Sequence, residues 1–179
     1  MIQMILCGRG GQGIVFLTRL LGDIATRKGL DVISSETHGM AVRGGSINSH
    51  LKIGSFSSPL VRWGHADYLL SMDMLETGNN RQFLKEGGVV FENSPVASES
   101  GLFRVDAARI ARSIGRIQLE NVVLLGFSAF LGNLEVSVED IRARLSQDPR
   151  ESVRNYNIKA LDAGVKVGSA MKTTGGSTG

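Results

Sequence analysis

The chain has 179 residues, enough for one domain with a sizeable core and too few for a multi-domain enzyme. Apolar residues make up 42% and charged residues 21%, a globular composition that excludes wholesale disorder, and the apolar runs are too short to cross a bilayer. The net charge is +3, from 20 basic and 17 acidic residues spread along the chain. This balance favours a small anionic ligand over nucleic acid or a membrane surface.

Cysteine usage restricts the chemistry further. Cys7 is the only cysteine, so the chain can form no internal disulfide, no redox pair and no cysteine-held iron–sulfur cluster. Any redox centre must therefore belong to a partner. Because no charged region precedes the first apolar run and a lone thiol suits a reducing compartment, we expect a cytoplasmic protein.

The first 35 residues have the pattern of a βαβ unit with a right-handed crossover. Residues 1–7 predict a strand, residues 8–13 a tight glycine-rich turn, and residues 31–35 a second strand. Between them, apolar side chains recur at helical spacing, namely Ile14, Leu17, Leu21 and Ile24. Gly29 is placed to cap the end of this helix.

The middle of the chain predicts an insertion into the sheet. Residues 36–45 form a long polar loop, and strands are expected at 46–53 and around 59–63, which together resemble a β-hairpin. After it we expect a buried strand over 67–72, a helix over 74–86 and a strand over 88–91.

The remainder predicts mostly helices. We expect a helix over 105–114, a central parallel strand over 121–125, a helix from the capping box at Ser137 through Leu145, and another from Asp148 to about Leu161. The fold class is α/β: a Rossmann-like, doubly wound, mostly parallel sheet with an inserted β-hairpin and C-terminal helices. Residues 1–167 are expected to form a single domain, and residues 168–179 have the composition of a flexible tail.

A glycine motif lies where the first strand turns into the first helix. Gly8, Gly10 and Gly13 satisfy G-x-G-x-x-G, a pattern in which free backbone N–H groups and the helix dipole attract a phosphate. The alternative is a plain tight turn. A nucleoside triphosphatase is disfavoured because Ile14 and Val15 stand where a P-loop has Lys and Ser or Thr.

A second polar loop follows the second strand. Glu36 lies where a dinucleotide-binding domain has the acidic residue that bonds a ribose hydroxyl. It is followed by a glycine-rich segment carrying His38 and Arg43, which is unusual where such domains begin their next helix. Because both loops lie at the carboxyl ends of strands, this segment could meet an anionic or carbonyl-bearing ligand next to the first glycine loop. A solvated surface loop is the alternative.

Other residue types give weaker signals. The three histidines, His38, His50 and His65, lack metal-ligand spacing, so no metal site is predicted. Ser128 lacks the surroundings of a nucleophile elbow. Asp73 follows a buried strand and suits either a ligand contact or a helix N-terminus, and Cys7 is expected in the core.

Four segments taken together resemble the gamma-type subunit or domain of 2-oxoacid:ferredoxin oxidoreductases, over most of residues 1–165. They are GRGGQG, ETHGMAVRGGSINSHLKIG, SSPLVRWGHADYLLSMDMLE and NVVLLG, in that order. Within this family the pattern is most similar to the small, free-standing beta subunit of indolepyruvate ferredoxin oxidoreductases. Val42 and Asp73 differ from the glutamine and glutamate that are common at these positions in the family.

The resemblance implies an enzyme complex that oxidatively decarboxylates a 2-oxoacid, forms an acyl-CoA and reduces ferredoxin. Thiamine diphosphate, Mg and the iron–sulfur clusters would lie in a larger partner subunit, with coenzyme A as cosubstrate and no cofactor held by this chain alone. No catalytic residue is assigned. Two loops are implied as ligand-facing or interface-forming: Gly8, Arg9, Gly10, Gly11, Gln12 and Gly13, and His38, Gly39, Arg43, Gly44 and Gly45.

Two alternatives to this function remain open. A stand-alone protein could bind NAD or FAD and use Glu36 on a ribose hydroxyl. A purely structural module could instead use its glycine loops only to fold tightly against another chain. The sequence also leaves open which 2-oxoacid the complex uses, although an aryl pyruvate is the substrate that the resemblance implies.

Overall fold

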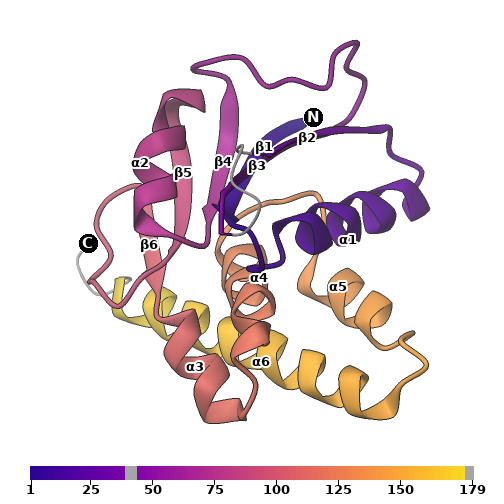
Figure 1. The fold of residues 1–179 in the computed structure, drawn as a ribbon, viewed down its shortest axis with the longest axis vertical. Helices are drawn as coiled ribbons and strands as arrows, with labels where there is room; N and C mark the ends of the chain where they lie inside the picture. Colours follow the sequence, from indigo (N-terminus) through magenta and orange to yellow (C-terminus); the bar gives the residue numbers. More distant parts are fainter. Residues whose placement is uncertain (39–43, 176–179) are drawn as a thin grey trace.

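The computed structural model describes residues 1–38 and 44–175 and contains a six-stranded, mostly parallel sheet (Figure 1). The strand order is β2-β3-β1-β4-β5-β6. Strands β1, β4, β5 and β6 run parallel, whereas β3 is antiparallel to both of its neighbours. The expected α/β class and mostly parallel sheet are confirmed.

In the described parts of the chain, all six strands come from residues before 106, and four α-helices follow them. The strands are β1 (Ile2–Arg9), β2 (Val32–His38), β3 (Ser46–Ile53), β4 (Ala66–Ser71), β5 (Leu84–Asn93) and β6 (Leu102–Val105). The helices are α1 (Ile14–Arg27), α2 (Met74–Asn80), α3 (Ala107–Ile114), α4 (Glu120–Leu131), α5 (Val138–Leu145) and α6 (Glu151–Gly175), with short 3-10 turns η1 (Arg81–Phe83) and η2 (Ile117–Leu119).

Helices cover both faces of the sheet. Helix α2 packs on β1, β4 and β5 on one face, over a smaller core that includes Ile5, Cys7 and Leu69. Helices α1 and α4 pack on the other face over the larger core. Helix α6 crosses behind α4 and contacts α3 and α5, so it forms an outer layer (Figure 1).

Glycines let α4 and α6 approach closely. A Cβ added at Gly164 would lie 2.0 Å from the Val123 backbone oxygen, and one at Gly126 would lie 2.3 Å from the Leu161 backbone oxygen. Both distances are far shorter than any van der Waals contact, so only a residue without a side chain fits at these two positions. The contact buries α4 on all sides, from Asn121 to Ala129.

Two expected helix ends have the predicted caps. Ser137 and Asp140 form a reciprocal capping box at the start of α5, with Oγ of Ser137 accepting from the Asp140 N–H at 3.1 Å and the Asp140 carboxylate accepting from the Ser137 N–H at 2.9 Å. At the end of α1, Gly29 has φ +76° and its N–H donates to the Thr26 oxygen. A left-handed residue at this place is favoured by glycine.

The expected βαβ unit at the N-terminus needs correction. Strand β3 lies between β1 and β2, with Ile2 opposite Ile53 in one pair and Val32 opposite Ile53 in the other. The hairpin is therefore β2–β3, and the expected strand around 59–63 is wrong. That segment is irregular and is held by the Val61 N–H donating to Nδ1 of His50 at 3.0 Å.

The expected central strand over 121–125 is also wrong, because these residues open helix α4. A short apolar run that is buried on every side shows no periodicity, so strand and helix look the same in sequence. Helix α2 ends at Asn80 instead of 86, because η1 and then β5 follow. Strand β6 was not expected, and α6 continues to Gly175, through residues whose composition predicts a flexible tail.

Candidate functional site at the carboxyl ends of β1 and β4

The chain leaves the two central strands of the sheet, β1 and β4, toward opposite edges of the sheet. From β1 the chain crosses to β2 and β3 on one side, whereas β5 and β6 follow β4 on the other side. In open α/β sheets this topological switch point is where ligands bind, outside the carboxyl ends of the strands. The glycine loop after β1 and residues Met72 and Asp73 after β4 occupy this place.

The glycine loop is a tight turn closed by its own side chains. Oε1 of Gln12 accepts from the Arg9 N–H at 2.7 Å, and the Gln12 N–H donates to the Arg9 oxygen at 3.0 Å. Gly11 and Gly13 have φ of +99° and +78°, values that favour glycine. Nε2 of Gln12 also donates to the Met72 oxygen at 3.3 Å, which joins the turn to the end of β4.

Two of the three motif glycines are required by packing within the chain. A Cβ added at Gly8 would lie 2.8 Å from Oε1 of Gln12, and one at Gly13 would lie 2.1 Å from Nδ2 of Asn121. The third glycine of the motif thus allows close packing, as expected, but against the start of α4. Gly10 and Gly11 are exposed, so their backbone is what the loop presents outward.

The second glycine loop returns onto the first. The Gly10 N–H donates to the Gly45 oxygen at 2.9 Å, and Gly44 has φ +68° with open space around its Cα. The expected proximity of the two loops is therefore present. The backbone of His38 ends β2 opposite Ile47, whereas Gly39 and Arg43 lie outside the described residues.

Arg9 and Asp73, two charged residues at this edge of the sheet, form an ion pair. Nε of Arg9 lies 3.0 Å from Oδ2 of Asp73, and Oδ1 of Asp73 accepts from the Leu75 N–H at 2.9 Å. Asp73 therefore caps α2, which is the second of the two roles expected for it. Arg9 remains half-exposed beside the loop, so it can still meet an anion or a partner chain from outside.

Three polar residues beneath the glycine loop were not found from the sequence. Asn93, at the end of β5, accepts at Oδ1 from the Ala107 N–H at 3.0 Å, and its amide donates to Oε2 of Glu120 at 3.3 Å. Burial raises the pKa of Glu120 above its ordinary value, against the opposing effect of the hydrogen bond from Asn93. With Asn121, these residues support the loop. The one available signal in the sequence is that two polar residues, Glu92 and Asn93, follow the apolar run that ends at Phe91.

Glu36 does not lie on a strand next to the one that carries the glycine motif, as the acidic residue of a dinucleotide-binding domain does. It lies within β2, opposite Ser49 of β3, and β3 separates β2 from β1. Because neighbouring strands are spaced at about 4.8 Å, the strand that holds the acid and the strand that leads to the glycine motif lie roughly 10 Å apart. In a dinucleotide-binding domain those two strands are neighbours.

Cys7 is a core residue. It is fully buried beneath α2, and burial raises the pKa of its thiol to about 12. Since the thiolate is the reactive and metal-binding form, this group is unsuited to nucleophilic catalysis or cluster ligation.

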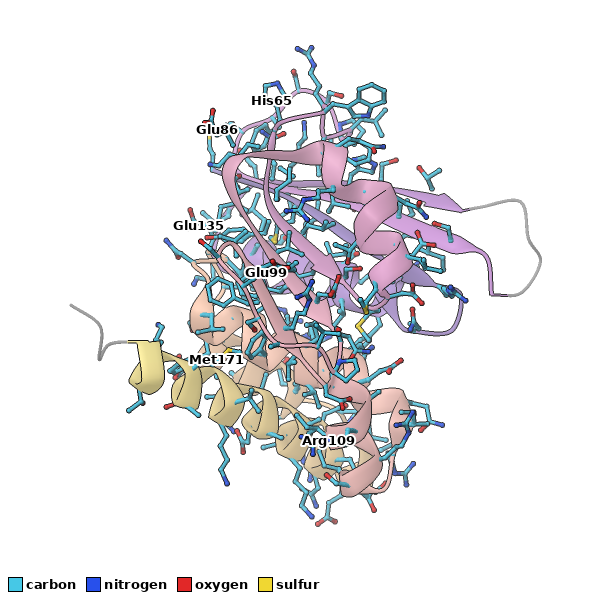
Figure 2. The ribbon with its side chains drawn as sticks, turned by 90° about the vertical axis from the view of Figure 1, so that its left-hand side faces the viewer. His65, Glu86, Glu99, Arg109, Glu135 and Met171 are labelled. Atoms are coloured by element: carbon cyan, nitrogen blue, oxygen red, sulfur yellow. The ribbon has the colours of Figure 1, made fainter. Side chains whose placement is uncertain are left out.

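His50 and His65, the two histidines whose side chains the structure describes, have different surroundings. His50 is buried and accepts from Val61, and burial lowers the pKa of its imidazole. His65 is exposed at the end of the molecule opposite α3 (Figure 2). Within residues 1–38 and 44–175, no three His, Cys, Asp or Glu side chains gather in a way that could hold a metal ion. None of the helices described there is long and apolar enough to cross a membrane.

Comparison with known families adds to this geometry. Residues 3–167 match the family described as "Pyruvate ferredoxin/flavodoxin oxidoreductase". The chain belongs to this family. A relative within it, the "Indolepyruvate oxidoreductase subunit IorB" of Pyrococcus horikoshii, is 31% identical over 94% of this chain and 96% of its own length. The expected gamma-type resemblance is confirmed.

Solved structures have the same fold. The "keto/oxoacid ferredoxin oxidoreductase, gamma subunit" from Geobacter sulfurreducens superposes with a TM-score of 0.77 at 24% identity, over 95% of this chain and 99% of that one. The "2-oxoglutarate:ferredoxin oxidoreductase from Magnetococcus marinus with 2-oxoglutarate, coenzyme A and succinyl-CoA bound" also gives 0.77, at 21% identity over 94% of this chain. This chain spans only 31% of that longer polypeptide.

Proposed function

We propose that this chain is the small subunit of a thiamine-diphosphate-dependent 2-oxoacid:ferredoxin oxidoreductase and is inactive alone. In the proposed reaction, a 2-oxoacid and coenzyme A give an acyl-CoA and CO₂, and two electrons pass to ferredoxin. The observation that carries this proposal is the pair of touching glycine loops at the switch point of the sheet, in a chain of this family. The likeness to an indolepyruvate oxidoreductase subunit supports an aryl pyruvate as substrate.

The electron carriers must lie in a larger partner subunit. A cysteine-held cluster needs several thiolates, whereas Cys7 is the only cysteine and its thiol is buried with a raised pKa. This chain therefore does not fit an iron–sulfur cluster. By the same resemblance, the partner would hold thiamine diphosphate and Mg and would contact ferredoxin. A chain with a single cysteine and no disulfide suits a reducing, cytoplasmic location.

The role of this chain is to shape the region where substrate and coenzyme A bind. The exposed backbone of Gly11 and the half-exposed Arg9 offer an N–H donor and a cation at the switch point, a combination that suits phosphate or carboxylate groups. The Gly10 N–H already donates to the Gly45 oxygen. Gln12 and Gly13 hold this backbone in place from within the chain. In the proposal, His38, Gly39, Arg43, Gly44 and Gly45 extend the same surface from the second loop.

A dinucleotide-binding protein is less well supported, because an antiparallel strand separates Glu36 from the glycine motif. A structural module has one observation in its favour: Gly8 and Gly13 are required by packing within the chain. Those two contacts explain the first and third glycines without any ligand. They do not explain why Gly10 and Gly11 present an exposed backbone, and that difference makes Gly10 the informative position.

Replacing Gly10 with valine tests this role. An added Cβ would lie 3.3 Å from the Gly44 nitrogen, so the larger side chain would separate the two loops and cover the exposed backbone. We expect turnover of the purified complex with indolepyruvate to fall roughly tenfold or more, because small displacements at a substrate-positioning surface are costly. Arg43→Ala should lower turnover too, since in the proposal this residue supplies a cation from the second loop.

Gly78→Ala is the matched control, because Gly78 lies on α2 with open space around it. All variants should keep the circular dichroism spectrum of the unmodified chain and assemble with the partner. Unchanged turnover in both Gly10→Val and Arg43→Ala would favour the structural module instead.

A further inference from the structure

A cavity of about 530 Å³ lies between α1, α5 and the start of α6, on a flank of α1 that the proposed function does not use. This volume is within the range of small-molecule sites, roughly 300–1,000 Å³. The lining residues are Val15, Phe16, Arg19, Leu20, Asp23, Arg144, Leu145, Asp148 and Asn157.

The two acidic side chains of this cavity are already neutralised. Asp23 accepts hydrogen bonds from Arg144 and from Nε of Arg27, the latter at 3.1 Å, and these bonds lower the pKa of its carboxyl. Asp148 pairs with Arg150 through two of its guanidinium nitrogens, at 2.9 and 3.1 Å. Both acids are therefore ionised and paired at neutral pH.

Arg19 lines the same cavity and has no acidic partner among the described residues. Within the described parts of the chain, its guanidinium forms no ion pair and no hydrogen bond. The charge of the cavity wall is therefore positive after each acid is matched with its arginine. A guanidinium binds a carboxylate through two parallel N–H donors, which gives direction as well as charge.

Asn157 supplies a second, independent observation. It is only 8% exposed, and its side chain lines the cavity without a hydrogen bond to any described residue. Among the described side chains, Oδ1 of Asn48 is the one buried polar atom without a partner, so the amide atoms of Asn157 keep contact with the open space of the cavity. A bound molecule with a polar group at this point could form a hydrogen bond with this amide.

The rest of the wall is apolar. Leu20 and Leu145 are buried at the base, and Val15 lies beside them. The Phe16 ring is 43% exposed at the rim, where it can contact a flat apolar group. The cavity thus combines one free guanidinium, one unpaired amide and an apolar base, which is the usual composition of a small-molecule site.

We propose that this cavity binds a small aryl carboxylate. In the bound state the carboxylate pairs with Arg19 and accepts from the Asn157 amide, while the aromatic ring contacts Phe16, Leu20 and Leu145. A polyphosphate is a poorer match because only one unpaired cation is available. All the residues that line the cavity belong to this chain.

Titration of the full chain with phenylacetate, followed by calorimetry and by amide shifts in a ¹H–¹⁵N spectrum, tests the proposal. We expect saturable binding, with shifts confined to α1, α5 and the start of α6. Phenylacetamide, which is neutral, and acetate, which has no ring, should each bind at least tenfold more weakly. Arg19→Gln should weaken phenylacetate binding roughly ten- to a hundredfold, through loss of a charge-assisted hydrogen bond.

Arg109→Gln is the matched control. Arg109 is 79% exposed on α3 and points away from the body of the molecule (Figure 2), so its loss should leave phenylacetate binding unchanged. The proposal would be overturned by the absence of saturable binding, by equal affinity for phenylacetate and phenylacetamide, or by an unchanged affinity in Arg19→Gln. Binding that disappears once the partner subunit is bound would identify the cavity as a subunit contact and would also overturn it.

Discussion

Gly164→Ala is expected to destabilise the chain by about 3 kcal/mol or more. The added methyl group would lie 2.0 Å from the Val123 oxygen and 2.8 Å from the Phe127 nitrogen. Both atoms belong to the backbone of α4, so no side-chain rotation relieves the overlap and the two helices must separate. That separation would loosen the packing of α4, which carries a large share of the main core.

Urea denaturation measures the loss in free energy of unfolding. In thermal unfolding, a chain of this length should lose roughly 6–12 °C in melting temperature. Gly78→Ala supplies the comparison: it adds the same methyl group to a helix, but into open space, and should be neutral or slightly stabilising. Equal stabilities of the two variants would mean that α4 and α6 are not in close backbone contact.

Gly13→Ala should have the second largest effect and lower the free energy of unfolding by about 2–3 kcal/mol. One part is the left-handed backbone at φ +78°, which costs a residue with a side chain about 1–2 kcal/mol. The other part is the overlap with the buried side chain of Asn121, whose Nδ2 would lie 2.1 Å from the new carbon.

The two parts can be separated by a double-mutant cycle. In Gly13→Ala combined with Asn121→Ala, the overlap is gone and only the backbone cost remains, so the two substitutions should be clearly non-additive. Gly11→Ala, at φ +99° with open space around it, should show the backbone cost alone. Strict additivity between positions 13 and 121 would contradict the packing of the glycine loop on α4.

The sequence predicts the local features that depend on neighbouring residues. The glycine turn after β1, the Gly29 cap and the Ser137–Asp140 capping box all form as expected. Each depends on a few residues whose backbone or side-chain chemistry permits one arrangement. The buried strand β4 was also expected, because a short apolar run followed by a helix-capping Asp73 marks its end.

Features that depend on distant residues were missed. Nothing in residues 46–53 indicates that β3 enters between β1 and β2, because that choice depends on which strand edges are free. Residues 121–125 were assigned to a strand because the α6 helix that covers their outer side is contributed by residues far along the chain. Asn93 and Glu120 cannot be found from the sequence for the same reason, because they meet only in the folded chain.

The same insertion of β3 separates Glu36 from the glycine motif. In sequence, Glu36 follows the glycine motif at the distance that a dinucleotide-binding domain requires. In the fold, β3 separates its strand from β1, and the loop that returns from β2 places Gly45 against Gly10 instead. Sequence spacing alone could not distinguish these arrangements.

Anaerobic purification of the tagged chain from its own host tests the proposed function most directly. The measurement is the set of proteins that co-elute, together with the visible spectrum and indolepyruvate-dependent dye reduction. We predict a larger partner subunit, the broad brown absorbance of iron–sulfur clusters and measurable activity. A colourless or flavin-yellow protein that elutes alone would contradict the proposed role as a subunit of a 2-oxoacid:ferredoxin oxidoreductase.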